Sequence, residues 1–188
     1  MGHKSGHSRS RHGLALGFTL LEMLVAVAVL AVLLGLAVPG FAGLRVRQQL
    51  QAQAQDFWNS LQLARTQAVL HQRHVTVCAA SAAGVCDGAA GWHGGWLVFV
   101  DDNRNGLREG GERVLLQRGR AQGVRITGNS TVNRWIGYGA EGRSENLNGG
   151  FQAGTVSVCS PGQTEGWRVV INAVGRPRLE KADLPDCP

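Results

Sequence analysis

One carboxylate, Glu22, lies near the start of a long apolar run that extends from residue 18 to residue 38. An acid at the centre of a membrane-length helix costs about 2.5 to 3.5 kcal/mol on insertion scales, although it costs less near a helix end. An ionisable side chain in such a segment is a functional hypothesis by default, and it needs a counter-charge. Glu22 therefore predicts ion pairing, and the candidate partner is an α-amino group created by cleavage between Gly17 and Phe18.

Arginines late in the chain offer a second kind of chemistry, the binding of anions. Arg176 and Arg178 flank a proline directly after Gly175, which favours a turn that presents two guanidinium groups at a fixed spacing. A guanidinium suits phosphate because its planar fork donates two parallel hydrogen bonds. Lys181 follows closely and adds a positive charge. These four residues are a candidate phosphate site, and a solvated basic turn is the alternative.

The charge of the surrounding segment is compatible with a polyanionic partner. Residues 113–181 contain ten basic and four acidic side chains, and a basic excess on an exported domain permits polyanion binding. Such an excess also occurs on ordinary soluble surfaces. The chain has no nucleophile elbow and no HExxH motif, so we expect neither an enzyme nor a small-molecule substrate.

Two further patterns have a structural and a functional interpretation. Residues 101–112 match the pattern D-x-[DN]-x-[DN]-G-x5-E of calcium loops, in which oxygen ligands would come from Asp101, Asn103, Asn105 and Glu112. Strands rather than helices flank this loop, and it contains two arginines, so we favour a hairpin loop with Asx turns over calcium. The glycines of residues 137–142 satisfy G-x-G-x-x-G. Because no helical pattern follows them, we expect a loop between strands and no nucleotide site. No other cofactor is expected.

Four cysteines follow the apolar run: Cys78, Cys86, Cys159 and Cys187. Basic residues without acids precede the run, so the positive-inside rule leaves that leader in the cytoplasm and exports the remainder. An exported, oxidising compartment favours disulfides. Of the three possible pairings, we expect Cys78–Cys86 and Cys159–Cys187, since each closes a local loop. Zinc is not expected because C-x-x-C spacing is absent.

Hydrophobic periodicity predicts the elements that must position these groups. The apolar run is long enough to cross a bilayer as a helix, and Pro39 with Gly40 should kink or loosen it. Helical periodicity then continues in apolar residues at steps of three and four: Leu50, Ala54, Phe57, Leu61, Ala64 and Ala68. We predict one long helix over residues 18–71. Strand patterns follow over residues 74–80, 96–101, 113–117, 124–126, 134–138, 154–159 and 167–173.

The junction Gly17-Phe18, with Thr19, Leu20, Leu21 and Glu22 after it, resembles the type IV prepilin signature, and Pro39 falls where many pilins carry a proline. In that family a prepilin peptidase cuts after the glycine and methylates the new N-terminal phenylalanine. The glutamate offsets the N-terminal amine of a neighbouring subunit. An ordinary signal peptide fits less well, because its apolar region spans about 7–15 residues and precedes the cleavage site.

Two other segments resemble the GspH/FimT group of minor pilins. Residues 95–112 resemble the strand, turn and next strand of these head domains, which favours a structural hairpin at Asp101. The segment from Gly175 to Arg178 resembles the G-R-x-R element of FimT-type pilins, which contributes to DNA capture during natural transformation. The resemblance implies a DNA-binding role for Gly175, Arg176 and Arg178. Lys181 is our addition from its proximity.

Together these observations predict an α+β fold of the pilin type, with a spine helix and an antiparallel β-rich head. We expect a cleaved leader over residues 1–17, a transmembrane helix over 18–39 and an exported head over 40–188. Within the head, residues 40–73 form an amphipathic helix and residues 74–188 are β-rich. The expected partners are other pilins, the prepilin peptidase, the inner membrane and DNA. A structural subunit that only primes pili and a GspH-type subunit of type II secretion remain alternatives.

Overall fold

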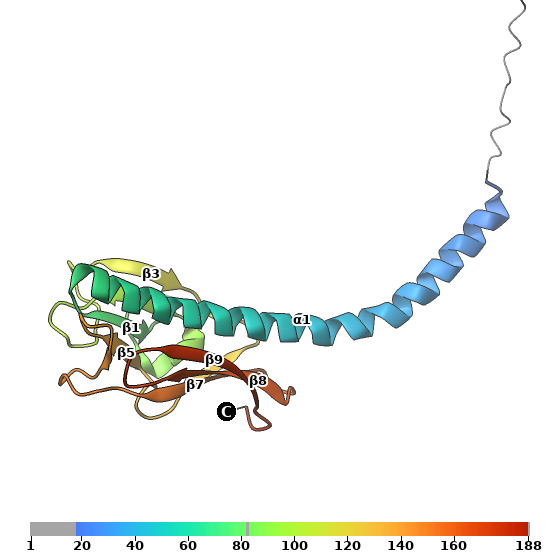
Figure 1. Ribbon diagram of the computed structural model, residues 1–188. Helices are drawn as coiled ribbons and strands as arrows, with labels where there is room; N and C mark the ends of the chain where they lie inside the picture. Colours follow the sequence, from blue (N-terminus) through green and yellow to red (C-terminus); the bar gives the residue numbers. More distant parts are fainter. Residues whose placement is uncertain (1–17, 82, 188) are drawn as a thin grey trace, which may run out of the picture. The chain divides into compact units, whose positions relative to one another are not determined.

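The computed structural model describes residues 18–81 and 83–187, without the side chains of residues 36–42 and 90. One helix precedes a series of short strands (Figure 1). The elements are α1 (Leu20–His71), β1 (Val75–Ala79), η1 (Gly88–Ala90), η2 (Trp92–Gly94), β2 (Trp96–Val100), β3 (Val114–Arg118), β4 (Arg125–Gly128), β5 (Trp135–Tyr138), β6 (Ser144–Glu145), β7 (Gly154–Cys159), β8 (Glu165–Ile171) and β9 (Pro177–Asp183).

The chain divides into two units, Met1–Ala42 and Gly43–Pro188. In the first unit, the large apolar side chains from Phe18 to Leu34 are 54% to 79% exposed. Within the described residues, no helix combines the length and the hydropathy that a membrane crossing needs. The transmembrane segment expected over residues 18–39 therefore stays a prediction. The helix itself is continuous through the position of Pro39, so the long helix is confirmed.

The second unit, the head, has its main hydrophobic core beneath the later half of α1, and Cys78, Ala80, Leu97 and Phe99 form a smaller second cluster. The six helix positions expected from periodicity, Leu50, Ala54, Phe57, Leu61, Ala64 and Ala68, are each 2% exposed or less. Phe57 packs edge-on against Trp92 and Trp96, with ring centroids 5.0 and 5.3 Å away. The indole of Trp96 donates a 2.9 Å hydrogen bond to the hydroxyl of Ser60. The N–H group of this buried indole is therefore hydrogen-bonded to a side chain of α1.

The strands form two antiparallel sheets, with the orders β3-β2-β1-β5-β6 and β4-β7-β8-β9. All seven predicted strands are present, with bounds that differ from the expected ones by at most one residue, except at β4 and β8, where the difference reaches two residues. The expectation that residues 175–178 form a turn was wrong in part, because β9 begins at Pro177 and pairs with β8 along its whole length. Proline is acceptable there as the first residue of an edge strand.

Both expected disulfides are confirmed. Cys78 bonds to Cys86, and Cys159 bonds to Cys187, with Cα–Cα separations of 5.6 and 5.7 Å. The second bridge holds the C-terminal tail to the end of β7. Because β9 precedes this tail, the bridge also limits how far the last strand can move from the sheet.

Replacing Cys159 and Cys187 together by alanine should lower the free energy of unfolding by about 3 kcal/mol, because the closed loop of 28 residues no longer restricts the unfolded chain. Equilibrium denaturation in urea, followed by tryptophan fluorescence, measures this. The matched control is the Cys78→Ala, Cys86→Ala variant, whose shorter loop predicts a smaller entropic loss. A loss below about 1 kcal/mol for the first pair would contradict this role for the bridge.

Candidate functional site

The processing site predicted at the N-terminus is only partly described. Gly17 lies outside the described residues, and Phe18 is 75% exposed. Thr19 caps α1, because its hydroxyl accepts a 3.2 Å hydrogen bond from the backbone N–H of Glu22. The sequence Thr19-Leu-Leu-Glu22 is thus the start of a capping box. Sequence analysis missed this second role, although the spacing of threonine and glutamate could have revealed it.

The carboxylate of Glu22 is available for a partner. None of the ion pairs between described residues involves it. Its position in the first turn of α1 is itself favourable, since the helix dipole stabilises an acid there. Glu22 therefore combines a local role at the helix end with an exposed charge in an apolar segment.

The turn that presents Arg176 is held by several contacts. Gly175 has φ of +77°, and a Cβ there would collide with the backbone of Gly142 and Arg143. The backbone N–H of Arg176 donates a 3.0 Å hydrogen bond to the side chain of Asn172. The carbonyl of Asn172 accepts bonds from the backbone of Gly175 at 2.9 Å and from a serine hydroxyl at 2.8 Å. This explains why glycine is needed at 175.

The loop beneath this turn is the glycine-rich segment between β5 and β6. Gly142 has φ of +74°, and its carbonyl accepts a 2.9 Å hydrogen bond from the guanidinium of Arg65 on α1. The expected connection between strands is thus present at this position. Arg143, the next residue, is exposed beside the turn. Sequence analysis missed it as a neighbour of Arg176, because the contact joins segments far apart in the chain.

The structure separates Lys181 from the arginines. In β9, Arg178 lies opposite Val170 and Lys181 lies opposite Trp167. Side chains alternate between the two faces of a strand, so positions 178 and 181 point to opposite faces. The ammonium of Lys181 is 5.8 Å from the ring centroid of Trp167, which packs against the core. Lys181 therefore does not extend the guanidinium pair.

On that inner side, Lys181 lines a small pocket together with residues of α1 and β8. Arg47 and Gln51 come from α1, and Glu165 with Trp167 comes from β8. Arg47 and Glu165 form an exposed ion pair at 3.8 Å. Such exposed pairs contribute little stability, and the pocket contains charges of both signs.

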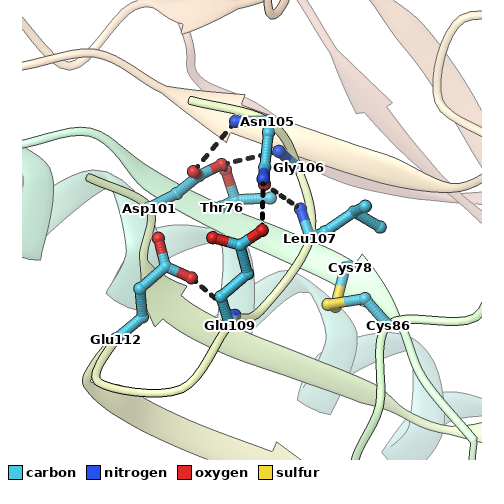
Figure 2. Close-up of a disulfide and its surroundings, with 9 residues drawn as sticks. All are labelled: Thr76, Cys78, Cys86, Asp101, Asn105, Gly106, Leu107, Glu109 and Glu112. Carbon is cyan, nitrogen blue, oxygen red and sulfur yellow. Dashed lines mark hydrogen bonds between the residues drawn. A yellow bond between two sulfur atoms is a disulfide. The ribbon is translucent and has the colours of Figure 1, made fainter. Parts of the chain in front are cut away.

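The candidate calcium loop is organised by Asp101, which is fully buried (Figure 2). Its carboxylate accepts hydrogen bonds from the hydroxyl of Thr76 at 2.7 Å and from the backbone N–H groups of Asn105 and Gly106 at 3.1 and 3.0 Å. Charge-assisted bonds of this kind satisfy a buried carboxylate without a cation. The loop leads from β2 to β3, as expected for a hairpin.

The other predicted ligands also accept hydrogen bonds within the loop. The side-chain oxygen of Asn103 accepts from the backbone of Asn105, and that of Asn105 accepts from Leu107. Both oxygens of Glu112 accept from backbone N–H groups, at 3.1 and 2.8 Å. Among the described residues, no group of three or more acidic, histidine or cysteine side chains has the arrangement of a metal site. These contacts favour the structural interpretation, and calcium stays an untested hypothesis.

Two residues of this region were missed by sequence analysis. Glu109 accepts hydrogen bonds from the side chains of Asn103 and Asn105 at 2.8 and 3.1 Å. His74 is buried, with Nδ1 3.8 Å from the carboxylate of Asp101. Burial lowers the pKa of His74, and Asp101 opposes this shift. A neutral imidazole beside a satisfied carboxylate is compatible with a structural role.

A family model described as "Type II transport protein GspH" matches residues 53–175, about two thirds of the chain. A second model, described as "Prokaryotic N-terminal methylation motif", matches residues 15–38. The latter match includes the Gly17-Phe18 junction and Glu22. No curated protein sequence matches the chain.

Solved structures share the fold at low sequence identity. The type IV minor pilin FimU of Pseudomonas aeruginosa has 23% identity and a TM-score of 0.54, over 71% of this chain and 90% of that chain. The minor pseudopilin EpsH of the Vibrio cholerae type II secretion system has 16% identity and a TM-score of 0.50, over 71% of this chain and 94% of that chain. At identities this low, the similarity shows a shared fold and nothing further.

The fold, the N-terminal motif and the extent of the family match agree with one another. The chain belongs to the GspH family and is a minor pilin or pseudopilin of the GspH/FimT type.

Proposed function

We propose that this protein is a FimT-like minor pilin that enters a pilus and assists the binding and uptake of DNA in natural transformation. The observation that carries the DNA hypothesis is the rigid turn at Gly175, which fixes the backbone of Arg176. Arg178 follows on β9, and both arginines are exposed. Because the backbone of this turn is already held in place, no loop has to be ordered when its guanidinium groups bind phosphate, which reduces the entropy lost on binding.

Entry into a fibre is supported by the exposed apolar surface of the first unit. Soluble proteins rarely expose large contiguous apolar patches, and the side chains from Phe18 to Leu34 would be covered by lipid and then by neighbouring spines. In this proposal the peptidase cuts after Gly17 and methylates Phe18. The protein crosses the inner membrane once, with its head in the periplasm, until it is extracted into the fibre. Glu22 then pairs with the N-terminal amine of a neighbouring subunit.

A pseudopilus subunit of a type II secretion system is the second candidate. The family description favours it, since it names a type II transport protein. Such a subunit, like one that only primes pilus assembly, needs the spine and the head but has no use for a DNA site. DNA binding by the arginine turn therefore distinguishes the first candidate from these two.

Replacing Arg176 and Arg178 by glutamine should weaken binding of the full-length protein, in nonionic detergent, to a 20-base-pair duplex. Loss of two phosphate contacts predicts a weakening of about 25-fold at low salt, at roughly 1 kcal/mol per contact, equally for all sequences. The dependence of log K on log salt concentration should become shallower by about two. Fluorescence anisotropy across a salt series measures both quantities.

The matched control for this experiment is the Arg108→Gln, Arg113→Gln variant. It has the same change of charge at exposed positions around the loop between β2 and β3. We expect the control to bind DNA nearly as the parent does. The DNA hypothesis fails if the Arg176, Arg178 variant keeps the affinity of the parent.

Replacing Glu22 by glutamine should reduce incorporation into fibres by at least tenfold, since the charge that pairs with a neighbour's amine is lost. Quantitative immunoblotting of sheared fibres against total cell protein measures incorporation. Glutamine keeps the size and the helix propensity of glutamate, so α1 should still form.

Thr19→Ala supplies the control for helix capping. It removes the hydroxyl that bonds the N–H of Glu22 but keeps the carboxylate, and loss of a cap costs about 1 kcal/mol of helix stability. We expect this variant to enter fibres. If it fails as severely as Glu22→Gln, capping rather than charge pairing explains the requirement for these residues.

For the loop between β2 and β3 we expect a structural role without calcium. Addition of 1 mM Ca²⁺ or of EDTA should leave the melting temperature unchanged, within about 1 °C, because hydrogen bonds already satisfy the carboxylates. Asp101→Asn should lower the free energy of unfolding by about 1–3 kcal/mol, since a charged acceptor of backbone N–H groups is lost. A melting temperature that rises with calcium, and only in the protein with Asp101, would restore the metal hypothesis.

A further inference from the structure

The four-stranded sheet has one face that points away from the core. Residues Val156, Val158, Val169 and Ile171 are buried in the core, and Leu179 packs against it. The alternate residues of the same strands therefore point outward. We call this surface the outer face, and on β7, β8 and β9 it consists of Thr155, Ser157, Arg168, Val170, Arg178 and Glu180.

The pairing register places Arg168 beside Arg178. Arg168 lies opposite Ser157 on β7 and opposite Glu180 on β9. Arg178 is two residues before Glu180, so the two arginines are diagonal neighbours on adjacent strands, with Cα atoms about 7–8 Å apart. Figure 1 shows β7, β8 and β9 as neighbouring strands.

These outward arginines lack carboxylate partners within the described part of the chain. Ion pairs there occupy Arg47, Arg73 and Arg118, and none includes Arg168 or Arg178. Glu180 does not pair with Arg168, although the register places them opposite each other. Unpaired guanidinium groups on one face leave their donors free for an anionic ligand.

We propose that a bound nucleic-acid backbone continues from the turn at Gly175 onto the outer face, where Arg168 is a further phosphate-binding residue. The hydroxyls of Ser157 and Thr155 on the next strand provide neutral donors to the same backbone. This inference rests on the proposed function and assigns the direction in which the ligand runs. The backbone crosses β9 and β8 rather than following the inner side, where Lys181 lies.

The C-terminal tail limits the outer face at its other end. Cys159 lies opposite Arg125 on β4 and bonds to Cys187. The tail therefore reaches the outer face near β4, and we confine the proposed contact to β7, β8 and β9.

The experiment compares Arg168→Gln with Lys181→Gln in the full-length protein in nonionic detergent, with a 20-base-pair duplex as probe. Both variants lose one positive charge from the same β8–β9 hairpin, but from opposite faces. Arg168→Gln should weaken binding about fivefold at low salt and reduce the salt slope by about one. Lys181→Gln should change affinity less than twofold.

Glu180→Gln tests the same contact by removing a negative charge beside Arg168 instead of a positive one. This exposed acid lies opposite Arg168, so its removal should strengthen DNA binding about threefold. A misfolded variant cannot produce tighter binding that keeps the salt dependence of the parent, so this variant separates a direct contact from damage to the fold.

The outcomes separate this inference from the proposed function. If Arg176→Gln, Arg178→Gln weakens binding while Arg168→Gln and Glu180→Gln leave it unchanged, the DNA contact ends at the turn and the outer-face proposal is wrong. Equal losses in Arg168→Gln and Lys181→Gln would show a general effect of charge and would also overturn it. If the parent does not bind DNA, the proposed function itself fails. Tighter binding of heparin than of duplex, with the same dependence on Arg168, would assign the face to acidic polysaccharides instead.

Discussion

The burial of one stripe of α1, from Leu50 to Ala68, is the interaction on which the rest of the head depends. The stripe packs into a single core with strands of both sheets. Three of its six positions are alanines without exposed surface, so the sheets approach the helix backbone closely. The helix α1 thereby holds both sheets in place. In each strand, the residues that face this core are buried, and the residues that alternate with them point outward.

Trp58 on α1 helps to fix the position of the turn that carries Arg176. The indole of Trp58 on α1 donates a 2.9 Å hydrogen bond to the carbonyl of Pro177, the first residue of β9. The turn before it rests on the loop that Arg65 of α1 holds through Gly142. Pro177, between the two arginines, and the loop beneath Gly175 are therefore each hydrogen-bonded to the helix, which explains how α1 fixes this surface turn.

The two units of the chain differ in whether their apolar side chains are buried. In the head, α1 buries its apolar stripe within the same chain, whereas the residues from Phe18 to Leu34 stay exposed. Apolar surface on this scale requires covering from outside the chain, and the assembly of minor pilins with other pilins supplies neighbouring subunits that could cover it. The head thus has its own buried core, while the described apolar side chains of the N-terminal segment have none.

Local sequence patterns by themselves determined the long helix, its buried stripe, most strands and both disulfides, because each depends on periodicity or on loops closed over short separations. They also indicated the N-terminal motif, and Thr19-x-x-Glu22 could have revealed the helix cap. Tertiary structure decided the rest. Strand β9 forms only because β8 lies beside it, since its sequence Pro-Arg-Leu-Glu-Lys-Ala-Asp has little apolar alternation. That pairing places Lys181 over Trp167 and puts Arg178 diagonally beside Arg168 on the other face. A strand directs alternate side chains to opposite faces, and only packing against the core decides which face points inward.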